Sequence, residues 1–134
     1  SLFARASAQF TNDKLLTGEQ INAGGGLYAK AYDPSELSGD RGYMVYGELR
    51  YDQEARVRGA DLGMQFYAFA DYAQVDLIDA APGTREDLSS IGAGLRLTYE
   101  RTNLELEAAL PRGGAVERNS SRSPRFFFSL TQRF

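Results

Sequence analysis

The stretch LGMQFYAFADYAQV, residues 62–75, alternates between two kinds of side chain along most of its length. One set of alternate positions is apolar, and it consists of Leu62, Met64, Phe66, Ala68, Ala70 and Tyr72. The opposite set contains Gln65, Tyr67, Phe69 and Asp71. A period of two residues is typical of a β-strand with two different faces, so this stretch predicts a strand.

The same alternation recurs in residues 2–10, 42–52, 91–100, 103–110 and 125–134. The pattern therefore predicts about six strands and no helix. Neighbouring strands are expected to pair as antiparallel hairpins, which makes the fold all-β. There is no run of about 18 apolar residues, so no transmembrane helix is expected.

Charged residues lie in mid-strand on one face of these strands. They are Arg5, Glu48, Arg50, Asp71, Arg96, Glu105 and Glu107. Strands of about ten residues suit a tilted bilayer crossing, and such charges line the wet lumen of an outer-membrane barrel. Tyrosines near apolar strand ends (Tyr43, Tyr51, Tyr72 and Tyr99) are typical of an aromatic girdle. The pattern favours a transmembrane β-barrel, with a soluble ligand-binding β-barrel as the alternative from another class.

The composition excludes several kinds of chemistry. The chain has no cysteine and no histidine, so disulfide scaffolds, His-based triads and most zinc sites are excluded. A net charge of -3 gives no reason to expect nucleic acid as a partner. Glu105 and Glu107 lie two residues apart on one face and could suggest carboxylate chemistry, but such residues more often line a lumen. We expect no enzyme, no metal and no cofactor.

The number of strands is too small for a closed barrel. Bacterial outer-membrane barrels have at least eight strands, and open edges in lipid would leave backbone groups without hydrogen bonds. Residues 1–134 are therefore expected to be the C-terminal part of a larger barrel, in agreement with a start at Ser1 inside a strand, or else to assemble with other copies. Phe134, after alternating apolar residues, resembles the signal that the bacterial barrel-assembly machinery reads.

A long polar segment, GGGLYAKAYDPSELSGDRG at residues 24–42, separates the first two strands. Together with the strand that follows, it resembles the long loop of two-partner secretion transporters, the hemolysin activation/secretion proteins of the outer-membrane assembly-factor superfamily. The matching residues are Gly24, Gly25, Tyr32, Ser38, Gly39, Asp40, Arg41, Gly42, Glu48, Leu49 and Arg50. Residues 66–75, 88–97 and 104–111 resemble later strands of that family, so the resemblance spans nearly the whole chain.

The resemblance implies that a loop of about residues 12–42 folds inward through the lumen. In the family, an arginine at the loop tip pairs with an acidic residue of the inner wall. Lys30 stands at the position of that arginine, Asp71 is the acidic residue, and Tyr32 is expected near Phe69. Ala31 replaces a glycine, which matters if that position needs a positive φ. In the alternative interpretation, Lys30 is solvated and Asp71 pairs with Arg96.

The function implied by the resemblance is secretion of a partner protein across the bacterial outer membrane. Lipid and the barrel-assembly machinery are the other expected partners. The family's N-terminal periplasmic domains and first barrel strands are absent from these 134 residues. A barrel-assembly-type insertase and a porin-like channel are the alternatives with the same wall pattern.

Overall fold

The computed structural model describes residues 1–78, 85–114 and 123–134. The strands are β1 (Leu2–Gln9), β2 (Ile21–Ala23), β3 (Leu37–Gly39), β4 (Arg41–Val57), β5 (Ala60–Asp76), β6 (Arg85–Tyr99), β7 (Thr102–Gly114) and β8 (Arg125–Gln132). These ranges contain no helix that could cross a membrane. The prediction of an all-β fold is confirmed.

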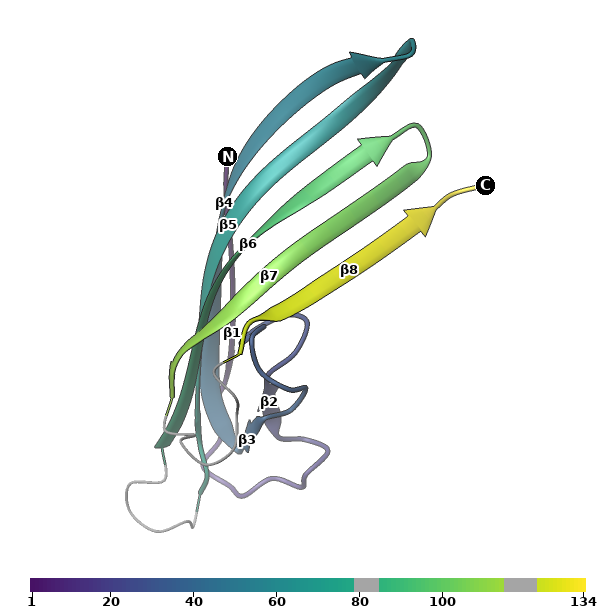
Figure 1. The fold of residues 1–134 in the computed structure, drawn as a ribbon. Helices are drawn as coiled ribbons and strands as arrows, with labels where there is room; N and C mark the ends of the chain where they lie inside the picture. Colours follow the sequence, from purple (N-terminus) through teal and green to yellow (C-terminus); the bar gives the residue numbers. More distant parts are fainter. Residues whose placement is uncertain (79–84, 115–122) are drawn as a thin grey trace.

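Six of the strands form one antiparallel sheet in the order β1-β4-β5-β6-β7-β8 (Figure 1). β4 and β5 have 17 residues each, so they are longer than the sequence pattern indicates. Their hairpin closes through Arg58 and Gly59, with φ of 51° and 89°, the positive values that a two-residue type I′ turn requires. β1 and β8 are the open edges of the sheet, which therefore corresponds to part of a barrel.

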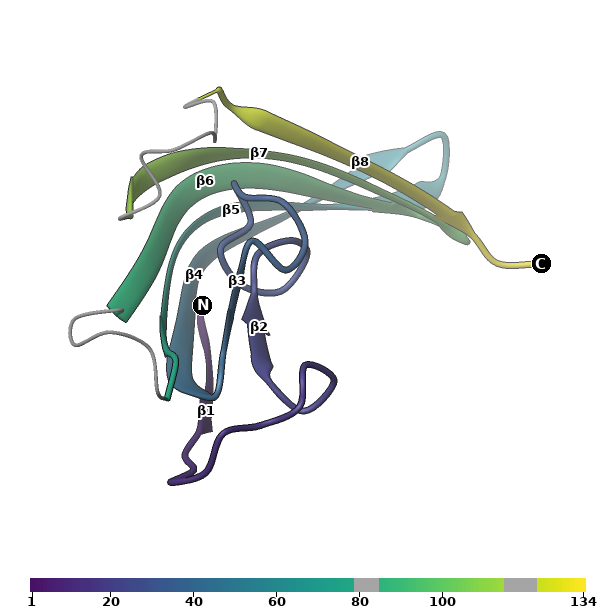
Figure 2. The ribbon, with the colours of Figure 1, turned by 90° about the horizontal axis from the view of Figure 1, so that it is seen from below.

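The sheet is strongly curved, and the segment that contains β2 and β3 lies on its hollow side (Figure 2). The face toward this segment carries the predicted charges. Tyr46 on β4 is opposite both Arg5 on β1 and Asp71 on β5, while Arg96 on β6 is opposite Glu105 on β7. We call this hollow side of the sheet the inner wall.

The other face of the sheet is apolar and exposed. The exposed side chains include Val45, Leu49, Phe66, Leu106, Phe126, Phe128 and Leu130. Phe128 and Leu130 of β8 stand opposite Leu106 and Leu104 of β7, so the apolar rows continue from strand to strand. The alternation read from the sequence thus separates an apolar outer face from a charged inner wall.

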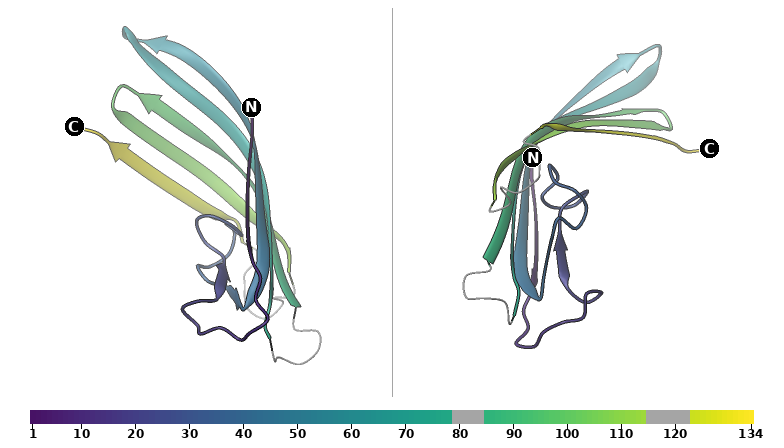
Figure 3. Two further views of the ribbon diagram at one scale, coloured as in Figure 1. Left: turned by 180° about the vertical axis from the view of Figure 1, so that it is seen from behind. Right: turned by 60° about the horizontal axis from the view of Figure 1, so that its bottom comes forward.

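The segment between β1 and β4 is folded, whereas the sequence pattern indicates only a long loop. β2 and β3 pair as a small two-stranded sheet beside the inner wall (Figure 3). Gly24 and Gly25 follow β2 with φ of 115° and 88°, and a Cβ at Gly24 would lie 2.0 Å from the Asp33 carbonyl oxygen. Glycine is therefore required where the chain turns toward the tip of the segment. We call residues 10–40 the inward loop.

Candidate functional site

The base of the inward loop is organised by Asp40, which is buried. Its Oδ1 accepts hydrogen bonds from the Leu15 amide at 2.9 Å and from Gln20 Nε2 at 3.1 Å, and its Oδ2 accepts one from the Ile78 amide at 2.8 Å. The Leu15 amide, followed by Gln20 and Ile78, lowers the pKa of the Asp40 carboxyl. One carboxylate thus joins the two ends of the loop to the end of β5.

Close packing explains the glycines on both sides of Asp40. A Cβ at Gly39 would lie 2.9 Å from the Asp76 carbonyl oxygen, and a Cβ at Gly42 would lie 2.3 Å from the Gln74 carbonyl oxygen. Arg41 is exposed and forms a partly exposed ion pair with Asp76 at 3.5 Å. The SGDRG motif is therefore the point where the loop joins the wall.

Asp71 of β5 binds the tip of the loop through the backbone. Its Oδ2 accepts a hydrogen bond from the Lys30 amide at 3.2 Å. Its Oδ1 accepts from the Ser90 amide at 3.0 Å and from Ser90 Oγ at 2.5 Å. The expected ion pair between the Lys30 side chain and Asp71 is wrong, because the loop backbone lies so close to β5 that the amide occupies the carboxylate.

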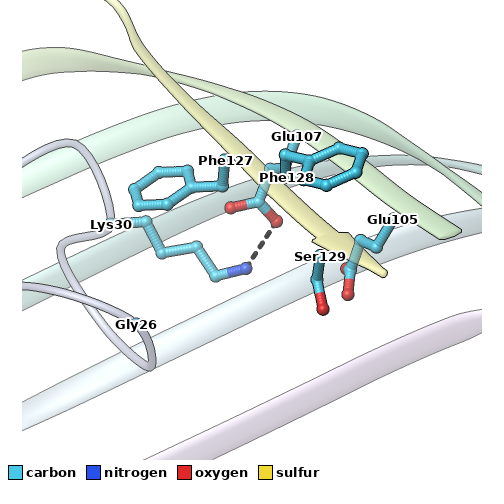
Figure 4. A pocket seen from close by; sticks show the side chains of 7 residues that line it. All are labelled: Gly26, Lys30, Glu105, Glu107, Phe127, Phe128 and Ser129. Atoms are coloured by element: carbon cyan, nitrogen blue, oxygen red, sulfur yellow. Dashed lines mark hydrogen bonds and ion pairs between the residues drawn. The ribbon is translucent and has the colours of Figure 1, made fainter. Parts of the chain in front are cut away.

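The Lys30 ammonium reaches further, to Glu107 of β7. Lys30 Nζ lies 2.6 Å from Glu107 Oε2, and the two side chains are only 14% and 6% exposed (Figure 4). The ammonium also lies over two aromatic rings, 4.8 Å from the centroid of Phe69 and 5.2 Å from that of Tyr46. Lys30 is therefore not a solvated loop lysine, and its long side chain connects the tip to a strand two positions beyond β5.

A cavity of about 260 Å³ opens beside this ion pair, toward β8. Lys30 and Gly26 line it from the loop, and Glu105, Glu107, Phe127, Phe128 and Ser129 line it from the wall. The tip of the loop and the described wall thus leave space between them next to the buried charges.

Tyr32 is buried against the other end of β6 and β7. Its hydroxyl lies 2.8 Å from the Gly113 carbonyl oxygen and 3.2 Å from that of Ser89, where the register of the two strands shifts. Burial raises the pKa of the Tyr32 hydroxyl, so this group stays protonated and donates to the two carbonyls. Tyr32 therefore lies against the inner wall, as expected. Among the described residues, the Phe69 ring stacks on Tyr46 and Tyr67, and the placement of Tyr32 near Phe69 stays a prediction.

At the loop tip, the alanine with a positive φ is Ala29 rather than Ala31. The Tyr32 amide donates to the Ala29 carbonyl at 3.0 Å, and the Gly25 amide donates to the Tyr32 carbonyl at 3.2 Å. Ala29 has a φ of 50° and is completely buried, whereas Ala31 has no positive φ. The glycine expected at position 31 is therefore not needed for its backbone conformation.

The last strand also holds the loop, through a residue that the sequence analysis did not single out. Arg125 at the start of β8 donates from Nη1 to the Tyr32 carbonyl at 2.9 Å and forms an ion pair with Asp33. Asp71, Ser89, Glu107 and Arg125 belong to four consecutive wall strands, β5 to β8, and each contacts the loop tip. The alternation placed Arg125 on the inner face but could not show which segment it meets.

Further along the wall, the charges pair with one another. Glu48 of β4 accepts from Arg50 Nε at 2.5 Å and from Arg96 Nη1 at 2.7 Å. Arg96 Nε also contacts Glu105 at 2.9 Å. Arg96 therefore does not pair with Asp71, and the alternative interpretation of Asp71 is wrong. Within the described ranges, no group of three or more acidic residues is arranged to hold a metal ion.

Phe134 lies beyond β8 and is fully exposed. Phe126 and Phe128 are exposed on the outer face of the same strand, in the alternation that the sequence shows. Nothing in this geometry tests the interpretation of Phe134 as an assembly signal, which stays a prediction.

Comparison with known proteins agrees with the loop and wall described above. No curated protein and no solved structure matches the chain. A family model described as haemolysin secretion/activation protein ShlB/FhaC/HecB matches residues 2–97, which include β1, the inward loop, β4, β5 and most of β6. Residues 104–111, which the sequence analysis included in its resemblance, lie outside the matched range. The chain belongs to the ShlB/FhaC/HecB family of haemolysin secretion/activation proteins.

Proposed function

We propose that this chain forms the C-terminal wall and the inward loop of an outer-membrane pore that secretes a partner exoprotein of the haemolysin or adhesin type. Its family consists of outer-membrane transporters of two-partner secretion in Gram-negative bacteria. The observation that carries the proposal is the set of contacts at the loop tip. The Lys30 amide donates to Asp71, and the Lys30 ammonium forms an ion pair with Glu107. An exposed apolar face on one side and a charged wall on the other also support it.

In this proposal the loop braces the wall and governs the pore. The ion pair between Lys30 and Glu107 is largely buried, so the attraction between the two charges is offset in large part by their loss of hydration. Further hydrogen bonds join the loop to three other strands, at Asp71 of β5, at the Ser89 carbonyl of β6 and at Arg125 of β8. The loop is therefore held by several weak contacts, an arrangement that can be displaced when the partner passes.

The remaining partners are part of the same proposal. Outer-membrane lipid contacts the apolar outer face, and Phe134 serves the barrel-assembly machinery. Periplasmic domains and additional strands elsewhere in the transporter capture the exoprotein and complete the wall, because a sheet with two open edges does not enclose a pore.

The experiment that tests the proposal is export of the partner by the intact transporter with Asp71→Ala. This change removes the acceptor of the Lys30 amide and of both Ser90 donors. We expect export to fall about tenfold, because buried donors lose their partner, while the barrel still reaches the surface.

Asp52→Ala is the matched control, because Asp52 is an exposed carboxylate of the same wall that bonds only to Gln65 among the described residues. Export should stay normal in this variant. Normal export by Asp71→Ala at equal surface levels of the barrel would contradict the proposal.

A further inference from the structure

Two aromatic rings of β5 lie flat across β6, each over a glycine. Tyr67 is opposite Gly94 and Phe69 is opposite Gly92, and both rings are buried. A Cβ at Gly94 would lie 2.3 Å from Cζ, 2.4 Å from the hydroxyl oxygen and 2.6 Å from Cε1 of Tyr67. A Cβ at Gly92 would lie 2.4 Å from Cζ of Phe69. The rings therefore occupy the volume that ordinary side chains on β6 would fill.

These flat rings form the floor on which the loop tip rests. The Lys30 ammonium lies 4.8 Å from the centroid of the Phe69 ring. The Tyr67 hydroxyl lies 2.8 Å from Oε2 of Glu107, the same oxygen that binds Lys30, and 2.9 Å from Oε1 of Glu105. A ring that stood away from β6 would lose both carboxylates, and Glu107 would lose the contact that orients it toward Lys30.

A cation from the wall holds the Tyr67 ring from its face. The Arg96 guanidinium lies 3.9 Å from the ring centroid, within the range of a cation–π interaction. Arg96 is itself fixed by Glu48 and Glu105. The ring is thus held from β6 by Arg96 and from β7 by two carboxylates, and its flat orientation depends on the space at Gly94.

We propose that Gly94 is a positioning residue for the inward loop: the absence of a side chain there lets the Tyr67 ring lie flat and orient Glu107 toward Lys30. This inference rests on the proposed inward position of the loop, but it concerns the seat of the loop and not the export of the partner. Gly92 acts in the same way beneath Phe69. Its Cβ would also meet the Ala108 carbonyl oxygen at 2.3 Å, which makes Gly94 the cleaner test.

The test measures how well the loop tip is protected in the intact transporter. Ala31 is 5% exposed, and the chain contains no cysteine, so Ala31→Cys places a single buried thiol at the tip. Outer membranes that contain the transporter, with this thiol as its only cysteine, are treated with a maleimide. We expect Gly94→Ala to raise the labelling rate about tenfold, because overpacking forces the ring away from β6.

Gly63→Ala is the matched control. Gly63 is a strand glycine of β5, where the nearest atoms to an added Cβ are those of Thr98 at 3.8 Å. Labelling in this variant should remain at the parental rate. An unchanged rate in Gly94→Ala, with the barrel assembled, would overturn the inference.

The Tyr67→Ala variant serves as a second starting point, which distinguishes a positioning role of Gly94 from general damage to the barrel. Tyr67→Ala removes the ring that orients Glu107, so labelling should already rise in this single variant. Adding Gly94→Ala to that variant should cause no further rise, because no ring remains to be displaced. A further rise of the same size would show that Gly94 acts elsewhere, and would overturn the inference. If labelling behaves as expected but export by Gly94→Ala is normal, the inference stands and the proposed role of the loop in export fails.

Discussion

The inner wall has two parts, and their carboxylates are bound by partners from different segments of the chain. In the part beneath the inward loop, the described partners of Asp71 and Glu107 include no arginine or lysine of the sheet. The loop supplies the missing donors through the amide and the ammonium of Lys30. In the part beyond the loop tip, Glu48 is held by wall cations, including Arg96.

This difference indicates that the covered part of the wall is incomplete without the loop. A carboxylate that is removed from water is costly unless it is paired or hydrogen-bonded. Ordering a long segment also costs conformational entropy, which the contacts of the tip must offset. The loop and the wall beneath it therefore stabilise each other, whereas the part beyond the loop tip, where Glu48 is also buried, depends only on its own strands.

The largest expected effect comes from comparing two glutamates on the same face of β7. Glu107→Gln leaves the buried Lys30 ammonium without its anion and should raise maleimide labelling of the Ala31→Cys reporter about tenfold. Glu105→Gln weakens the support of Arg96 and of the Tyr67 hydroxyl but removes no direct contact of the loop, so labelling should rise less than threefold, within about 0.7 kcal/mol. Equal effects of the two changes would remove the distinction between the two parts of the wall.

A smaller effect is expected at the last strand. Arg125→Ala removes the donor to the Tyr32 carbonyl and the ion pair with Asp33. Because Asp33 is exposed and the bond to the Tyr32 carbonyl is only partly buried, labelling should rise about threefold, and Arg125→Lys should recover part of the protection. No change in Arg125→Ala would mean that β8 does not hold the loop.

The base of the loop should respond to acid. The folded-state pKa of Asp40 is lowered, chiefly by the Leu15 amide, so its stabilising contribution is fully present above the ordinary pKa of an aspartate. It is lost as the pH falls through the lowered folded-state pKa.

The thermal midpoint of wild type should therefore exceed that of Asp40→Asn at neutral pH, and the difference should narrow in acid. The change in electrophoretic mobility on heating reports this midpoint for the intact barrel. If the difference between the two thermal midpoints widened as the pH falls, the lowered folded-state pKa of Asp40 would be contradicted.

The smallest effect is expected for Lys30→Arg. The guanidinium keeps the charge beside Glu107 and can still lie over Phe69 and Tyr46. Loop protection and export should stay within about twofold of wild type, which corresponds to about 0.4 kcal/mol. Lys30→Met serves as the comparison that retains length and loses charge; if both variants lost protection equally, the charge would not be what matters.

The sequence predicts the sheet well, because a period of two residues assigns every side chain to one of two faces. The inner position of Glu48, Asp71 and Arg96 follows from that pattern alone. It does not show which segment covers a face, since that depends on contacts between residues far apart in the chain. The pairing of Lys30 with Glu107, across 77 residues, was therefore missed.

One available signal could have indicated where the loop sits. Tyr67 and Phe69 are large aromatic residues on the charged face, and they stand opposite two glycines of β6. Aromatic rings on a wall that otherwise meets water indicate that something covers them. The positive φ at Ala29 has no comparable signal, because it results from tertiary packing in a fully buried turn.

The most direct test of the claim that the loop completes the wall is a double-mutant cycle on Lys30 and Glu107. The reporter is the labelling rate of Ala31→Cys in the intact transporter, measured for Lys30→Met, for Glu107→Gln and for the two changes together. We predict that each single change raises the rate and that the double variant is no faster than the faster single variant, because both changes break the same contact. Rates that multiply in the double variant, or single variants that label like wild type, would contradict the account.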